Sequence, residues 1–229
     1  MSKYKETTGY IIHCRDFKNS SLILEFFSKD FGLIHLIAKG IKKNKLQKPQ
    51  LNYFSLIKIQ FYGKSSLKTL TTINLITFHQ LTTLIDRTSG LYFNELLHLC
   101  LNENEKVSEL FECYHKSLIQ IINSNKTHIF RNFERKLLEQ SGFEIDISSY
   151  QDDDWLTVNE IDGLTLALVN RSKIIQVHDV KKFLTNKSLN KATQKNINKL
   201  MYELINLCVS HREIHSRKML VHLYQLQTN

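Results

Sequence analysis

The sequence predicts an α+β protein with two domains. A five-stranded barrel is expected over residues 1–80, and a mainly α-helical domain with a small β-hairpin over residues 81–229. Near residue 80 the spacing of apolar residues changes from alternation, typical of strands, to the period of a helix. The net charge also changes there. The 229 residues, 42% of them apolar, suffice for two small domains with real cores.

Five segments of the first 80 residues have the features of strands. The first begins at Gly9–Cys14, and the second, Ser21–Ser28, alternates between two faces. Lys29–Gly32 is predicted as a turn in which the glycine supplies a positive φ, followed by a return strand at Leu33–Ala38. These segments therefore indicate an antiparallel hairpin preceded by one more strand.

A polar, lysine-rich loop is predicted at Ile41–Gln50, which contains the single proline of the chain. The fourth strand, Tyr53–Tyr62, places its apolar residues on one face, at Ile57, Ile59 and Phe61. The fifth strand, Leu67–Phe78, is rich in Thr and Ile. Five short strands suit a closed barrel, which leaves no free sheet edge. The OB-fold is the commonest such barrel and binds oligonucleotides, and an SH3-like barrel is the alternative.

Helical spacing dominates after residue 80. The predicted helices are Thr83–Leu101, Val107–Ile122, a third with Thr127 as its N-cap and Gly142 at its end, Asp179–Leu184, Thr193–His211 and Ser216–Tyr224. Between the third and fourth helices, an acidic loop and a hairpin around Asp162-Gly163 are expected. The second domain is thus mainly α-helical.

The positive charge is confined to the first domain. The chain has 31 Lys and Arg against 22 Asp and Glu, a net charge of +9. Residues 1–80 hold thirteen basic and four acidic residues, whereas residues 81–229 hold eighteen of each. A general compositional bias would spread the excess evenly. Its concentration in the barrel indicates binding to a polyanion.

The candidate phosphate contacts lie mainly in the loop after the third strand. Lysine is a mobile point charge, suited to phosphates without reading sequence. The candidate DNA-binding residues are Arg15, Lys39, Lys42, Lys43, Lys45 and Lys68. Aromatic residues near strand ends are candidates for stacking on unpaired bases, although each taken alone is more typical of a core residue: Phe17, Phe31, Tyr53 and Tyr62.

No catalytic or metal-binding motif is present, so we expect no enzymatic activity, no cofactor and no metal. Four scattered cysteines form no CxxC pair, which favours reduced thiols in a cytoplasm. His211 and His215 lie four apart but have no acidic or cysteine ligand at a useful offset. An exposed acidic loop is the preferred interpretation of Asp152–Asp154. Neither a secretory signal nor an apolar run of membrane-spanning length is found.

Five segments, in order and spacing, carry a resemblance to a known family. They are Gly32–Gly40 (GLIHLIAKG), Leu67–Leu70 (LKTL), Tyr92–Leu97 (YFNELL), Phe130–Leu138 (FRNFERKLL) continuing to Gly142-Phe143, and Ser216–Leu220 (SRKML). Over essentially its full length the chain resembles the RecO family of bacterial DNA repair and recombination mediators.

The resemblance implies an N-terminal OB-fold and a C-terminal α-helical domain. It also implies binding of single- and double-stranded DNA, annealing of complementary strands, and help in loading RecA onto strands coated by single-strand-binding protein (SSB). RecR and, in some bacteria, RecF are the implied partners, and the implied location is the nucleoid in the cytoplasm. Many family members carry a four-cysteine zinc motif where this chain has no cysteine, in 144–174. The departure predicts no zinc there.

The resemblance further implies a groove on the helical domain for the acidic C-terminal tail of SSB. Such a tail requires an apolar pocket beside fixed positive charge. Arg131 matches the family's basic position before a Phe-Glu pair, Arg135 lies one helical turn later, and Lys173 roughly aligns with another basic position. The alternative is that these are ordinary surface charges.

Two other functions fit the charge pattern. An RNA-binding or ribosome-associated OB-fold protein would have the same basic barrel, and comparing DNA with RNA separates these functions. A metal-dependent nuclease would use Asp152–Asp154, and it would cut DNA when Mg²⁺ is added.

Overall fold

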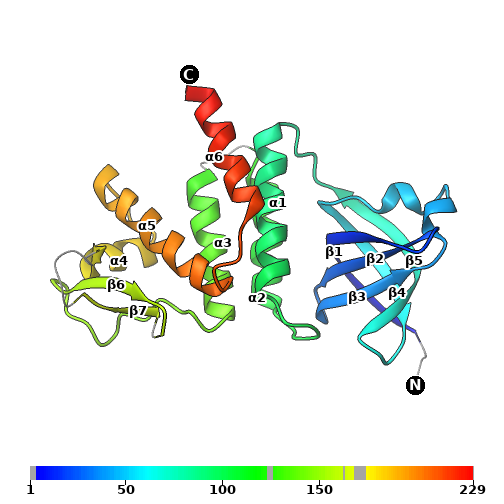
Figure 1. Cartoon of the computed structure of the whole chain (residues 1–229), viewed down its shortest axis with the longest axis horizontal. Coiled ribbons are helices and arrows are strands. Elements are labelled where there is room, and N and C mark those ends of the chain that lie inside the picture. The colour runs from blue at the N-terminus through cyan, green and yellow to red at the C-terminus, as the bar shows by residue number, and fades with distance from the viewer. Residues whose placement is uncertain (1–3, 123–125, 162, 168–173, 229) are drawn as a thin grey trace. The chain divides into compact units, whose positions relative to one another are not determined.

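The computed structural model describes residues 4–122, 126–161, 163–167 and 174–228 (Figure 1). The chain forms two compact units, one of residues 1–133 with 214–229 and the other of residues 134–213. None of the described helices is long and apolar enough to cross a membrane.

The first unit begins with a closed five-stranded barrel (Figure 1). Its strands are β1 (Lys5–Phe17), β2 (Ser21–Ser28), β3 (Gly32–Ala38), β4 (Ser55–Tyr62) and β5 (Leu67–Phe78). The order around the barrel is β1-β2-β3-β5-β4, with β4 pairing back to β1 and β3 running parallel to β5. This is the Greek-key barrel of the OB-fold. The predicted fold class is confirmed. The chain does not form the SH3-like barrel that was the alternative.

Alternating residues fill the barrel. The predicted inward face of β4 is confirmed, because Ile57, Ile59 and Phe61 are buried in the core cluster. Successive side chains of a strand point to opposite faces. On β2, Leu24 and Phe26 therefore point inward, which places their neighbours on the outer face. The barrel thus has a core of its own.

The observed strands and loops differ from the prediction in detail. β1 is longer than Gly9–Cys14, and its register with β2 shifts between Ile11 and His13. β4 begins at Ser55, two residues later than predicted. The predicted loop after β3 contains two short 3-10 turns, η1 (Ile41–Lys43) and η2 (Lys48–Gln50). These differences leave the order of the strands unchanged.

Two glycines at the ends of the first resemblance segment adopt positive φ. Gly32, in the predicted turn, has a φ of 65°, and Gly40 has a φ of 68°. An added Cβ at Gly32 would also lie 1.7 Å from the backbone oxygen of Glu105, whereas at Gly40 nothing lies within 4 Å. Gly32 is therefore required both for its backbone conformation and for the close approach of the α1–α2 connection.

Four helices complete the first unit: α1 (Leu84–Cys100), α2 (Ser108–Gln120), the start of α3 (Lys126–Gln140) and α6 (His215–Thr228). Thr83 and Asp86 form a capping box at the start of α1. Thr127 is not an N-cap, because α3 already begins at Lys126. That prediction was wrong by one residue or more, since a polar side chain within the first turn resembles a cap in sequence.

Two of the resemblance segments meet in this unit. The carboxylate of Glu95 accepts hydrogen bonds from the backbone N–H groups of His215 and Ser216, at 2.9 and 2.8 Å. The guanidinium of Arg217 lies 5.9 Å from the centre of the Tyr92 ring. The glutamate therefore caps α6 and fixes it against α1.

The described part of the second unit contains the end of α3, a three-stranded sheet and two further helices. The sheet has the order β7-β6-β8, with β6 at Trp155–Asn159, β7 at Gly163–Leu166 and β8 at Ile175–Gln176, and the helices are α4 (Val177–Leu184) and α5 (Lys191–Cys208). The predicted hairpin is present as β6 and β7, although Asp162 lies outside the described residues. β8 has only two residues and too little pattern for sequence analysis to find.

The predicted boundary at residue 80 and the packing of the chain divide it differently. Strands give way to helices between Phe78 and Leu84, close to the predicted boundary. The compact units, however, separate after Phe133 and before Ile214. The reason is that α1 and α2 contact the barrel, for example through Phe27 and Phe111, whose ring centres lie 5.4 Å apart. A boundary at residue 80 stays a prediction.

Candidate nucleic-acid interface

The lysine-rich loop between β3 and β4 is anchored at both ends to the barrel. Near its start, the backbone N–H of Lys42 donates a 3.0 Å hydrogen bond to the carbonyl of Ser20, next to β2. At its end, the side-chain oxygen of Gln50 accepts a 3.0 Å hydrogen bond from the backbone N–H of Leu75 on β5. The loop is therefore held across the barrel instead of extending away from it.

Most of the loop's ammonium groups are exposed. Lys39, Lys43, Lys45 and Lys48 are exposed and form no ion pair within the described parts of the chain. Lys42 differs, because its Nζ lies 2.7 Å from a carboxylate oxygen of Asp16 and its side chain is only 26% exposed. Surface pairs contribute at most about 1 kcal/mol. A phosphate can therefore replace Asp16 at modest cost.

Strand register places Arg15 near this loop. Arg15 on β1 pairs with Ile23 on β2, and Ile23 in turn pairs with Ile37 on β3. Lys39 follows Ile37 by two residues along the chain. Arg15 is exposed. Five predicted contacts thus belong to one part of the barrel surface: Arg15, Lys39, Lys42, Lys43 and Lys45.

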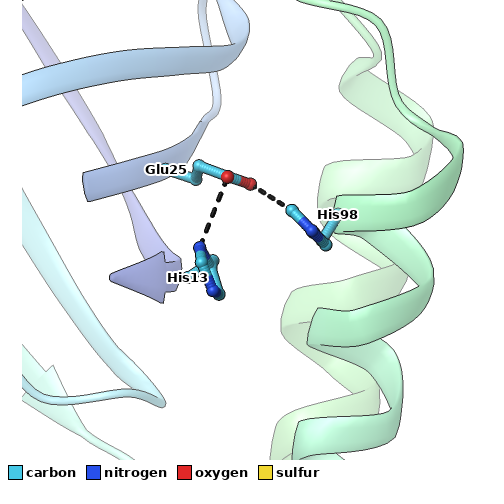
Figure 2. A group of neighbouring side chains, drawn as sticks. All are labelled: His13, Glu25 and His98. Carbon is cyan, nitrogen blue, oxygen red and sulfur yellow. Dashed lines mark hydrogen bonds and ion pairs between the residues drawn. The ribbon is translucent and has the colours of Figure 1, made fainter. Parts of the chain in front are cut away.

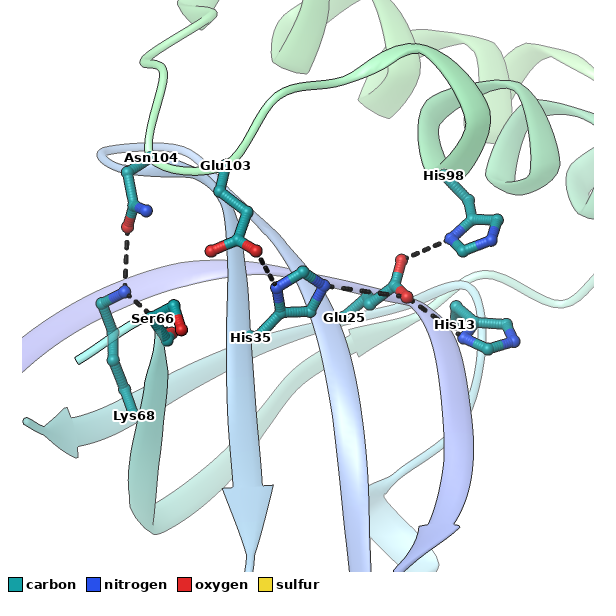
Figure 3. A network of polar contacts seen from close by, with 8 residues as sticks. All are labelled: His13, Glu25, His35, Ser66, Lys68, His98, Glu103 and Asn104. Atoms are coloured by element: carbon teal, nitrogen blue, oxygen red, sulfur yellow. Dashed lines mark hydrogen bonds and ion pairs between the residues drawn. The ribbon is translucent and has the colours of Figure 1, made fainter. Parts of the chain in front are cut away.

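Lys68 is engaged elsewhere. Its Nζ donates to the carbonyl of Ser66 at 3.3 Å and to the side-chain oxygen of Asn104 at 2.9 Å (Figure 3). Burial, assisted by the nearby charge of Lys5, lowers the pKa of Lys68, while Glu103 opposes the shift. The structure therefore ties Lys68 to the connection between α1 and α2 and does not join it to the loop.

The four candidate stacking residues divide into two pairs. Phe31 and Tyr53 pack against the barrel core, and the ring of Phe31 meets that of Phe61 edge-on at 5.6 Å. Phe17 and Tyr62 are half-buried. Phe31 and Tyr53 therefore have the contacts of core residues, and a stacking role for any of the four stays a prediction.

The candidate SSB-tail residues are Arg131, Arg135 and Lys173. Arg131 and Arg135 are half-buried on α3, one turn apart, around the buried side chains of Phe133 and Glu134. Lys173 lies outside the described residues. The pocket predicted for the tail therefore stays a prediction.

A buried polar contact connects β1 to α2. The hydroxyl of Tyr10 lies 2.9 Å from Nε2 of His79 and 2.5 Å from Nδ1 of His115. Burial lowers the pKa of His79, and the neighbouring His115 lowers it further. Burial also raises the pKa of Tyr10 above its usual range. These shifts favour the uncharged forms of Tyr10 and His79 at neutral pH.

A group of histidines and carboxylates was missed by sequence reasoning. His13, Glu25 and His98 place one potential metal-ligand atom each within 4.8 Å of the others (Figure 2). No motif in the sequence indicated this group, and the expectation of no metal stays a prediction. One signal was present: a hairpin turn at residues 29–31 pairs Glu25 with His35. The remaining members come from β1 and α1, whose positions the hairpin does not determine.

Two family models match the chain. "Recombination protein O N terminal" matches residues 1–79, and "Recombination protein O C terminal" matches residues 81–150. A DNA repair protein RecO from Cellvibrio japonicus is 33% identical over 142 residues, which cover 60% of this chain and 59% of that protein. Another from Idiomarina loihiensis is 34% identical over 144 residues, covering 59% of this chain and 60% of that protein.

A third relative, the DNA repair protein RecO of Psychromonas ingrahamii, is 29% identical over 61% of each chain. The matches therefore span about three fifths of these relatives. A closed five-stranded barrel with an exposed basic loop and a following helical region defines an OB-fold protein with an appended α-helical part. By its sequence, the chain belongs to the RecO family.

Proposed function

We propose that this protein is a DNA repair and homologous recombination mediator that binds single- and double-stranded DNA and anneals complementary strands. With RecR, and in some settings RecF, it helps RecA to assemble on DNA coated by SSB. It acts on the nucleoid in the bacterial cytoplasm and breaks no covalent bond. The observation that carries the proposal is the OB-fold barrel of a RecO-family chain that holds the entire charge excess of +9.

The exposed lysines of the basic loop explain how the protein would bind DNA and anneal its strands. Lys39, Lys43 and Lys45 bind phosphates and release the counterions condensed on DNA. Neutralising one strand reduces its repulsion of a second strand, so complementary strands approach and anneal. Phosphate contacts carry no sequence information, as a mediator acting at any damaged site requires.

A salt titration tests the interface. Fluorescence anisotropy with single-stranded DNA at increasing salt should give a steep linear decline of log affinity against log salt. Replacing Lys39, Lys43 and Lys45 together by Glu should weaken binding and flatten the slope by about 0.7 per lost contact. A flat slope for the native protein, or full affinity in the variant, would refute the interface.

A control variant shows whether DNA affinity depends on the charge of the loop or on the net charge of the whole protein. Lys187, Lys191 and Lys195 are exposed residues of the second unit, and their replacement by Glu changes the net charge equally. This control should retain most of the affinity. Equal losses in both variants would mean that only the total charge matters, and that the loop is not the contact.

Activity and partner assays test the rest. The protein should speed annealing of complementary strands and, with RecR, shorten the lag of RecA assembly on SSB-coated DNA. Tighter binding to RNA than to DNA of equal sequence, without annealing, would favour the RNA-binding alternative.

The proposed SSB contact uses Arg131, with Arg135 and Lys173 as further basic groups. A peptide of the SSB tail should bind the native protein and bind the Arg131→Ala variant more weakly, because the peptide's terminal carboxylate loses a charge-assisted partner. Equal affinities would reject Arg131 as that partner.

A further inference from the structure

A row of three polar residues crosses the outer face of the barrel. His13 on β1 is the Cα partner of Glu25 on β2, and Glu25 is the Cα partner of His35 on β3. Directly opposed residues of paired strands lie within contact distance on one face. The irregularity in β1 immediately before His13 is of the kind that redirects side chains. Three strands therefore direct two imidazoles at one carboxylate.

The last turn of α1 adds a third imidazole to this row. His98 Nδ1 lies 2.6 Å from one carboxylate oxygen of Glu25, and His13 Nδ1 lies 3.3 Å from the other (Figure 2). The rings of His13 and His98 lie nearly parallel, with centres 4.8 Å apart. The two nitrogens thus approach the same carboxylate from different elements of the first unit.

The geometry is close to that of a tetrahedral metal site. Bonds of about 2.0–2.1 Å to zinc place neighbouring ligand atoms about 3.3 Å apart. The three candidate atoms already lie within 4.8 Å of one another. Small rotations of exposed rings are enough to admit an ion. Two imidazoles with one carboxylate form a ligand set used by zinc, whereas Mg²⁺ and Ca²⁺ prefer oxygen ligands alone.

His35 lies between two carboxylates beside the group of three and is not a member of it. Its Nδ1 lies 2.8 Å from Glu103, while its Nε2 faces Glu25 at 3.7 Å (Figure 3). Partners of this kind orient a ligating carboxylate, so His35 is a positioning residue for Glu25. The side chain of Glu25 is only 12% exposed, but His13 and His98 are about 40% exposed, at 42% and 39%. The site is therefore open to an ion from solvent.

We propose that His13, Glu25 and His98 bind a divalent transition-metal ion of the zinc class, with the fourth position taken by water. The ion takes the place of the protons that the imidazoles otherwise share with Glu25. It links β1 and β2 of the barrel to α1. This site is separate from the basic loop and does not depend on the proposed function in DNA repair.

Titration of the tag-free full-length chain tests the site. Isothermal titration with Zn²⁺ should give one equivalent bound, and Zn²⁺ should raise the melting temperature. Co²⁺ should bind with a visible spectrum of nitrogen and oxygen ligands, without the intense near-ultraviolet band of thiolate coordination. His13→Gln and His98→Gln should each weaken Zn²⁺ binding by at least about tenfold.

His222→Gln is the matched control. His222 is an exposed histidine of α6, and its replacement should leave affinity and stoichiometry unchanged. The proposal is overturned if the native protein binds no Zn²⁺ at millimolar concentration, if binding survives both His13→Gln and His98→Gln, or if the Co²⁺ spectrum shows thiolate ligands. Circular dichroism checks that the variants fold. If they do not, the stoichiometry and the Co²⁺ spectrum of the native protein decide.

Discussion

The basic loop and the outer face of the same barrel differ in whether their charged groups are paired within the fold. In the loop, Lys39, Lys43 and Lys45 are exposed and form no ion pair within the described residues. On the outer face, Glu25 is almost covered and is approached by three imidazoles. The lysines of the loop are therefore charged groups in solvent, whereas the charged groups of the outer face pair within the fold.

The surroundings of the two regions account for this difference. The outer face is covered by α1 and α2, and Phe27 and Tyr10 are completely buried there. The loop has only two short 3-10 turns, and its charged groups stay in water. Variants that damage one region and spare the other therefore test the comparison.

The largest expected effect is on the outer face. Phe27→Ala should lower the free energy of unfolding by about 3–5 kcal/mol, because it leaves a cavity between β2 and α2. Urea denaturation measures this loss. Phe78→Ala is the control, since Phe78 is 50% exposed on β5, and it should cost less than about 0.5 kcal/mol. Similar losses would show that the helices do not cover this face in solution.

Two glycines at the borders of the loop and of the covered face form a second test. Gly40→Ala should cost about 1–2 kcal/mol, the penalty of a left-handed conformation with free space around it. Gly32→Ala should cost clearly more, because its new Cβ also meets the backbone of Glu105. Equal unfolding free energies in urea would mean that the α1–α2 connection does not pack against this turn.

Acid should weaken the covered face through His79. An unfolded histidine has a pKa of about 6.5, and burial lowers the pKa of His79 in the fold. Below about pH 6.5 the unfolded state therefore binds the proton first, and stability falls as the pH falls, by at most about 1.4 kcal/mol per pH unit. Above that pH the contribution is fully present.

Urea denaturation between pH 7.5 and 5.5 measures this effect. His79→Gln should flatten the dependence, and His222→Gln should leave it unchanged. A native protein whose stability does not change over this range would contradict the assignment.

The smallest expected effect is in the loop. Asp16→Asn should tighten DNA binding a few-fold, because Lys42 loses its carboxylate partner and becomes available to phosphate. Glu6→Gln makes the same change in net charge and frees Lys58 on β4. It should have a weaker effect if the loop is the contact. Anisotropy titration compares the two variants.

The prediction from sequence was most accurate where the information was local. Alternation on β2 and β4 located the strands, and the spacing of leucines located the helices to within a few residues. Thr127 was misread as a cap, since a threonine in the first turn of a helix resembles a cap in sequence. β8 was missed, because two residues carry no periodicity.

Of the candidate site, only the part formed by residues close together in the sequence was predicted. The basic loop was found because five lysines occur within ten residues. The position of Lys68 beside Asn104 was not, since the two residues are 36 positions apart. His13, Glu25, His35 and His98 come together only through the pairing of three strands and the docking of α1.

The sequence by itself determined the strand and helix segments, the concentration of positive charge in the barrel and the resemblance to the RecO family. These properties depend on residue type and short-range spacing, which can be read along the chain. Only the tertiary structure decided which charges are paired and which are free. Closing the barrel and packing α1 and α2 against it bring distant residues into contact, and the electrostatic state of a side chain depends on those neighbours.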